Sequence, residues 1–187
     1  MHSLEPNSPP TQPTPAGATP SPKVYVGVDN GLTGAVAAWF PNGHWHFWPV
    51  AVEDSGKQRL LNIAAACDCL ERLAAQAGGK DNLVVGCELP PVNPRFGAKS
   101  NFTCGRCGEF WRVLLTMQGI PFAFVRAQTW QKDVFQGIPD GDSKVVAARF
   151  VEQRFPGALN GQRLNKVQRA GVVDAMCIAA WSRLQAR

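Results

Sequence analysis

The order of strand-forming and helix-forming patterns constrains this chain more than any other feature. Residues 24–29, 34–40 and 44–50 are short apolar or alternating runs separated by turn signals, a pattern typical of an antiparallel meander. Two further strand-like runs, at 82–88 and 121–127, alternate with segments of helical periodicity. A meander followed by strands that alternate with helices predicts an α/β fold with a five-stranded mixed sheet flanked by helices.

Helical spacing of apolar residues predicts four helices, over about 57–76, 103–118, 142–154 and 166–185. A proline-rich loop precedes the second of them, and Asp142-Ser143 is a helix N-cap signal for the third. Trp130 is expected to anchor a helix against the core, with DNA contact as the less favoured alternative.

The first 22 residues differ from the rest of the chain. They are rich in Pro, Ser and Thr, with no aromatic and no basic side chain, so we expect residues 1–22 to be a disordered tail and 23–187 to be one globular domain. The tail resembles neither a signal peptide nor a transit peptide, and no later run is long enough to cross a bilayer. The sequence therefore predicts an intracellular, cytoplasmic protein without a membrane partner.

Cysteine usage and charge narrow the function further. Of six cysteines only Cys104 and Cys107 have metal-ligand spacing, and no second pair completes a zinc site, so reduced structural thiols are expected. The net charge of +5 comes from residues 126–187, which hold ten basic and five acidic side chains. Residues 95–112 are also locally basic. A polyanionic partner and an ordinary solvated surface explain this charge equally well.

Three acids stand at unusual places. Asp29 ends the first strand, Glu88 ends the fourth, and Asp174 lies on the apolar stripe of the last helix. A buried, unpaired carboxylate is costly, and gathered carboxylates repel unless a cation lies between them. We therefore expect these three acids to be catalytic ligands of Mg²⁺ or Mn²⁺. Two such ions activate a water and stabilise the leaving oxygen in phosphodiester cleavage.

Five segments carry a family resemblance. They are "VGVDNGLTGAVA", "LVVGCELPP", "VRAQTWQKDV", "DGDSKVVAARFVEQRFPG" and "AGVVDAMCIAAW". In order and spacing the chain resembles the RuvC-type Holliday-junction resolvases, in particular the phage and organellar branch of that ribonuclease-H-like superfamily. The resemblance covers roughly residues 24 to 184. It implies a metal-dependent endonuclease that acts as a homodimer on four-way DNA junctions.

The resemblance also implies roles for particular residues. Asp29, Glu88 and Asp174 correspond by motif position to the catalytic acids, and the loop 91–103 with its following helix to the element that approaches the junction centre. Stacking of Phe96 or Phe102 on an unpaired base is one alternative, and inward packing is the other. The expected DNA-binding residues are Arg95, Phe96, Lys99, Phe102, Arg106, Lys132 and Lys144. The helix over 103–118 is the expected dimer interface.

The chain departs from the family at one place. Ala170 and Gly171 stand where the family commonly has a fourth acid or a histidine, about one helical turn before Asp174. The chain is therefore expected to be an active junction-resolving nuclease with three acids, or alternatively a weakened or inactive junction-binding protein of the same fold. A third, less favoured alternative takes "DNGLTG" as the phosphate turn of the actin and sugar-kinase superfamily, which requires a second similar domain.

Overall fold

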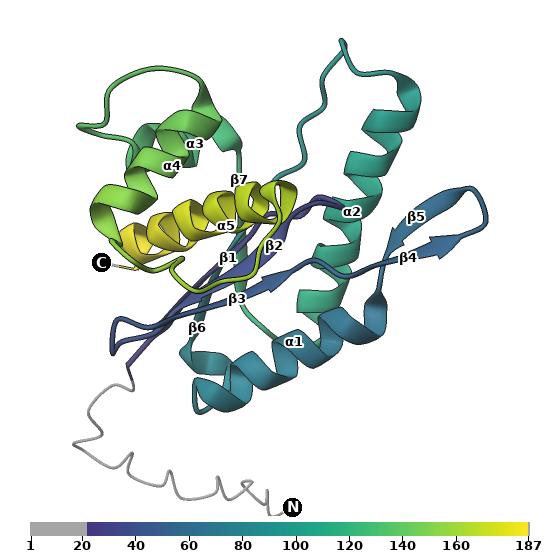
Figure 1. The fold of residues 1–187 in the computed structure, drawn as a ribbon. Helices are drawn as coiled ribbons and strands as arrows, with labels where there is room; N and C mark the ends of the chain where they lie inside the picture. Colours follow the sequence, from purple (N-terminus) through teal and green to yellow (C-terminus); the bar gives the residue numbers. More distant parts are fainter. Residues whose placement is uncertain (1–21, 187) are drawn as a thin grey trace, which may run out of the picture.

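The computed structural model describes residues 22–186, so the predicted tail lies outside the described residues except for Pro22. Its main sheet has the strand order β3-β2-β1-β6-β7 (Figure 1). The strands β3, β2 and β1 pair antiparallel, whereas β1, β6 and β7 pair parallel. This confirms the predicted mixed five-stranded sheet. The strand bounds are β1 Val24–Val28, β2 Ala35–Trp39, β3 Trp45–Pro49, β6 Leu83–Glu88 and β7 Phe122–Val125.

Helices cover both faces of the sheet because its central strands are apolar on both sides (Figure 1). One face packs against α1 and α2, and the other against α3, α4 and α5. The helix bounds are α1 Ile63–Gln76, α2 Ala98–Met117, α3 Ala127–Val134, α4 Ser143–Arg154 and α5 Lys166–Gln185, with a short 3₁₀ turn at Lys80–Asn82. The described residues form one such sheet and not the two similar domains that a sugar kinase needs.

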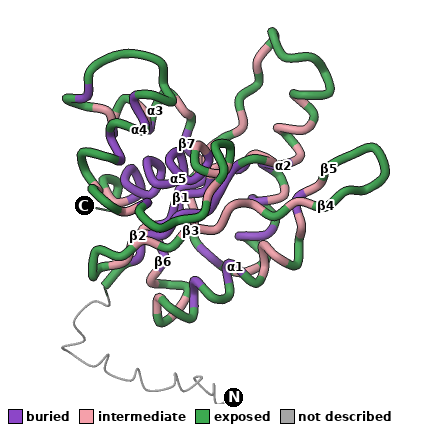
Figure 2. The backbone as a smooth tube through the Cα atoms, viewed as in Figure 1, coloured by how far each residue is buried: buried purple, intermediate pink, exposed green. Residues whose placement is uncertain are grey.

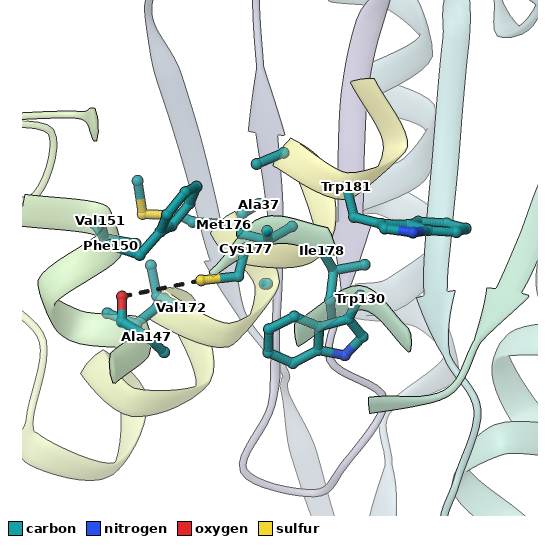
Figure 3. Packing of buried hydrophobic residues seen from close by; sticks show 14 of the residues in the cluster. Ala37, Trp130, Ala147, Phe150, Val151, Val172, Met176, Cys177, Ile178 and Trp181 are labelled. Carbon is teal, nitrogen blue, oxygen red and sulfur yellow. Dashed lines mark hydrogen bonds between the residues drawn. The ribbon is translucent and has the colours of Figure 1, made fainter. Parts of the chain in front are cut away.

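The last helix, α5, is the centre of the structure. Every residue from Gly171 to Ser182 is buried (Figure 2), because the sheet covers one side of the helix while α3 and α4 cover the other. Figure 3 shows this core, in which the Cys177 thiol lies 4.0 Å from the Ala147 carbonyl oxygen of α4. Trp130 of α3 is buried in the same cluster, as the sequence indicated.

Gly27 sets how closely α5 approaches the sheet. A Cβ atom built there would overlap the Ala175 carbonyl oxygen and lie 2.5 Å from the Ala179 amide nitrogen. The backbone of α5 therefore rests directly on β1. Since Asp174 is the neighbour of Ala175, this contact carries its carboxylate to the end of β1, next to Asp29.

Two element boundaries differ from those predicted. The helix expected from residue 57 begins only at Ile63, where the Asn62 side chain caps it by accepting a hydrogen bond of 2.8 Å from the Ala65 amide. The preceding residues form a hairpin of β4 (Val52–Ser55) and β5 (Gln58–Leu61). The loop expected over 91–103 ends earlier, because α2 already begins at Ala98.

Two further expectations concern membranes and thiols. No helix within residues 22–186 combines the length and the apolar character that crossing a bilayer requires. All six cysteines are free thiols. Burial raises the pKa values of Cys87, Cys107 and Cys177, so these thiols are poor nucleophiles and fit the structural role expected of them.

Candidate active site

Two of the three acids lie side by side at one edge of the sheet. β1 and β6 run parallel in the register Val28↔Cys87, and the next residue on each strand is Asp29 and Glu88. The carboxyl ends of parallel strands meet at the same edge, so both side chains project from the same place. The Asp29 amide also donates a 3.0 Å hydrogen bond to the Ala35 carbonyl oxygen, which extends the pairing of β1 with β2.

The turn after β1 closes around Asp29. Asn30 is 7% exposed, and its side-chain amide donates to the Glu88 carbonyl oxygen, which ties the ends of β1 and β6 together. The Asp29 carboxylate accepts a 3.4 Å hydrogen bond from the Gly31 amide. These contacts hold Asp29 and Glu88 close to each other at the ends of β1 and β6.

Asp174 reaches this edge from the helical layer. It is 6% exposed and pairs with the ammonium of Lys144, which lies in the first turn of α4. Asp142 caps that turn by accepting a 3.0 Å hydrogen bond from the Lys144 amide. The predicted N-cap, Asp142, thus fixes the turn from which Lys144 of α4 reaches Asp174 of α5.

The three carboxylates are near enough to one another for their charges to shift the pKa values of Asp29 and Glu88. Burial, and then the charge of Asp174, raise the pKa of Asp29 to about 6. Burial, and then the charges of Asp29 and Asp174, raise the pKa of Glu88 to about 7. The pKa of Asp174 is also raised by burial, although Lys144 opposes the shift. Desolvation lowers the pKa of Lys144, but its hydrogen bond to Asp174 and the three negative charges raise it by more.

Trp130 is a neighbour of the cluster that the sequence did not place there. Its buried indole N–H has no hydrogen-bond partner among the described residues. It nevertheless lies close enough to Glu88 to lower the pKa of that carboxyl. The signal available in the sequence was its position shortly after the fifth strand, which ends at the same edge as Glu88.

The donor set fits a hard divalent cation. Carboxylate oxygens are the ligands that Mg²⁺ and Mn²⁺ prefer, and the three acids carry more negative charge than Lys144 neutralises. Within residues 22–186 no three acidic, histidine or cysteine side chains are already arranged around a common ion position.

The remaining predicted residues lie apart from the cluster. Arg95, Phe96, Lys99, Phe102 and Arg106 belong to an arm formed by residues 91–106, which projects beyond the sheet at the start of α2 (Figure 1). Phe96 and Phe102 are 42% and 66% exposed, so neither packs inward. Lys132 lies on α3, and its charge is not among those that shift the pKa values of the three acids.

Arg106 supports the arm. Its guanidinium lies 5.8 Å from the centre of the Phe102 ring, and it donates hydrogen bonds of 3.0 Å to the Gln58 side chain and 2.8 Å to the Arg59 carbonyl oxygen. Both acceptors belong to β5, so the hairpin that the sequence did not predict braces the base of the arm.

One large cavity of the described structure lies elsewhere than at the acids. It has a volume of about 950 Å³ and lies between the carboxyl ends of α4 and α5, beside Trp39, Trp45 and Phe155. No member of the acidic cluster lines it. The carboxylates instead lie, largely buried, at the carboxyl edge of the sheet.

A mixed five-stranded sheet with helices on both faces and acids at its carboxyl edge defines a ribonuclease-H-like fold. Two solved structures of RuvC from Thermus thermophilus have this fold. The first, in complex with a Holliday junction substrate, aligns with a TM-score of 0.55 and 14% identity over 88% of this chain and 95% of that one. The second aligns with a TM-score of 0.51 and 14% identity over 87% and 96%. No protein-family model and no curated protein sequence matches the chain.

The similarity establishes a RuvC-like α/β fold. The assignment to the phage and organellar branch rests on the sequence motifs alone and stays a prediction.

The raised pKa values predict how stability depends on pH. Folded Asp29 and Glu88 bind protons more tightly than the unfolded chain does, with pKa values of about 6 and about 7 against 3.8 and 4.5. Their contribution is therefore most favourable below about pH 4 and is lost as the pH rises towards 7. Without divalent ions we expect the two acids together to lower the free energy of unfolding by roughly 5 kcal/mol over this range.

Urea unfolding in EDTA at several pH values measures this effect. The double variant Asp29→Asn, Glu88→Gln is the control, because its free energy of unfolding should lack this part of the pH dependence. Parallel pH profiles for the two proteins would contradict the prediction.

Proposed function

We propose that this protein is a structure-selective DNA endonuclease that resolves four-way junctions by metal-dependent phosphodiester hydrolysis. The observation that supports the proposal is that Asp29 and Glu88 end neighbouring parallel strands of a RuvC-like sheet, near enough to Asp174 for its charge to raise their pKa values. The basic excess of residues 126–187 and the junction bound to the similar RuvC structure support DNA as the substrate.

The three acids and Lys144 have different proposed roles at the site. Asp29, Glu88 and Asp174 are the proposed ligands of Mg²⁺ or Mn²⁺, which when bound polarises the phosphate and lowers the pKa of a bound water. The Asn30 hydrogen bond to β6 fixes the spacing of Asp29 and Glu88 before any ion arrives. Lys144 places a positive charge beside Asp174, and 62% of its side chain is exposed. An incoming phosphate could therefore reach it.

Incubation with a labelled four-way junction and Mg²⁺ tests the function directly. We expect paired nicks in opposed strands, and no cleavage of a linear duplex of the same sequence. Absence of nicks on the junction with both Mg²⁺ and Mn²⁺ would reject the nuclease.

The arm is proposed to hold the centre of the junction, and two variants separate its contributions. Phe102→Ala should weaken junction affinity by about tenfold, since stacking on a base contributes roughly 1–3 kcal/mol, and it should leave the salt dependence unchanged. Lys99→Ala should instead reduce the slope of log affinity against log salt by about one, as expected for a lost phosphate contact.

Fluorescence anisotropy at several salt concentrations measures both quantities. Ile63→Ala on α1, which removes an apolar side chain that is 62% exposed, is the control and should change neither. If Phe102→Ala behaves like this control, Phe102 does not stack on DNA.

The proposed partner is a second copy of this chain, because two opposed strands require two sites related by a two-fold axis. α2 offers an apolar surface for it, since Val113 and Met117 lie one turn apart and are 54% and 81% exposed. Sedimentation of the purified protein, free and bound to a junction, tests the pairing. A single chain per junction would reject it.

The alternative is a protein that binds junctions without cutting them. The ion pair of Lys144 with Asp174 favours it, because it occupies an acid that the nuclease uses. This alternative predicts tight, structure-selective binding in EDTA and no nicks with any divalent ion.

A further inference from the structure

We propose that the site holds one divalent ion, between Asp29 and Glu88, and that Lys144 replaces the second ion by remaining bound to Asp174. This inference rests on the proposed nuclease function and deepens it. Of the three acids proposed as ligands, Asp29 and Glu88 then bind the ion, and Asp174 holds the lysine instead.

The charges of the cluster balance with one ion. Asp29, Glu88 and Asp174 carry three negative charges when ionised, and Lys144 is the one cationic side chain in the described structure whose charge shifts their pKa values. Two negative charges remain, which a single divalent ion neutralises. A second ion beside the lysine would leave the site positive and would have to displace the ammonium from Asp174.

The lysine is held in place by its helix. The Asp142 side chain accepts hydrogen bonds from the amides of Lys144 and Val145, which fixes the first turn of α4. Further along, Ala147 packs against Cys177 of α5, one turn beyond Asp174 (Figure 3). The ammonium and the carboxylate are therefore brought together by the packing of two helices.

One of the two positions for a fourth ligand, residue 171, is closed. Gly171 lies one turn before Asp174, and a Cβ atom there would lie 2.5 Å from the Thr33 carbonyl oxygen and 3.0 Å from the Gly34 Cα. Backbone of the turn after β1 thus occupies the space that an acid or histidine at 171 would need. Asp174 is the only acid of α5, which leaves a second ion without a ligand from this helix.

Mn²⁺ titration of the full-length protein without DNA tests the inference by calorimetry and by the electron paramagnetic resonance of free Mn²⁺. We expect one ion per chain in the wild type. Lys144→Met keeps the length of the side chain and removes its charge, so it should tighten Mn²⁺ binding by about tenfold. Lys57→Met, the matched change in the exposed turn between β4 and β5, should leave both affinity and stoichiometry unchanged.

Two ions per wild-type chain would overturn the inference, as would unchanged Mn²⁺ affinity in a Lys144→Met protein with wild-type circular dichroism. These outcomes are separate from the fate of the proposed function. A chain that binds one ion but leaves junctions intact rejects the nuclease and keeps the inference, whereas a chain that cuts junctions with two bound ions does the reverse.

Discussion

Asp29→Asn should abolish junction cleavage, leave junction binding intact and make the metal-free protein more stable. The loss of activity is expected to be at least about 10³-fold, because a carboxylate that holds the proposed ion contributes several kcal/mol through it. Binding persists because phosphate contacts to basic side chains elsewhere supply most of the affinity.

The gain in stability follows from the raised pKa. Folding holds the Asp29 carboxyl at a pKa of about 6 instead of 3.8, so at neutral pH the ionised form destabilises the folded state. The neutral amide removes this penalty, and we expect the free energy of unfolding to rise by roughly 2 kcal/mol in EDTA. A loss of cleavage together with a gain in stability distinguishes a functional carboxylate from a structural one.

Nicking assays, anisotropy and thermal unfolding measure the three quantities on one preparation. Asp68→Asn is the matched control, since Asp68 is exposed on α1 and pairs only with the exposed Arg72 in a 3.0 Å ion pair. It should change none of the three. An Asp29→Asn protein that cuts junctions normally, or that unfolds more easily than the wild type, would refute this account of the site.

Gly27→Ala is expected to have the largest effect on stability. Its added methyl group would overlap the Ala175 carbonyl oxygen, and because the obstacle is helix backbone, no side-chain rotation relieves it. We expect a loss of about 3 kcal/mol or more in the free energy of unfolding. Any folded fraction should also lose cleavage, since a displaced α5 carries Asp174 away from Asp29.

The matched control is Gly105→Ala. Gly105 lies within α2, and a Cβ atom there meets nothing within 4 Å. Alanine should therefore stabilise this helix slightly, by about 0.5–1 kcal/mol. Urea unfolding compares the two variants. Equal stability of Gly27→Ala and the wild type would show that α5 does not rest on β1 as closely as described.

Much of the architecture was predictable from local patterns. Strands such as β1 and β6 are short, strongly apolar and closed by an acid, and α4 and α5 have clear capping residues, Asp142 and Asn165. Such elements form because their apolar and capping residues lie within a few positions of one another in the sequence. Their order then restricts the sheet to very few topologies.

Two features were missed because they depend on competition between elements. Leu60 and Leu61 fit a helical stripe, yet they pair in β5, since the cap at Asn62 starts α1 later and β4 offers partners. Lys144 was expected to face phosphates, and the structure places its ammonium on Asp174. Its role towards phosphate remains a prediction.

By itself the sequence determined which acids are candidates for the site, because an acid that ends an apolar strand or lies on an apolar helix stripe is visible from its neighbours in the chain. Only the tertiary structure decided what those acids meet. The contact of α5 with Gly27, the lysine on Asp174 and the closed position at Gly171 all join residues that are distant in sequence. Such contacts are set by backbone packing between layers. This packing produces no periodic pattern in the sequence from which it could be predicted.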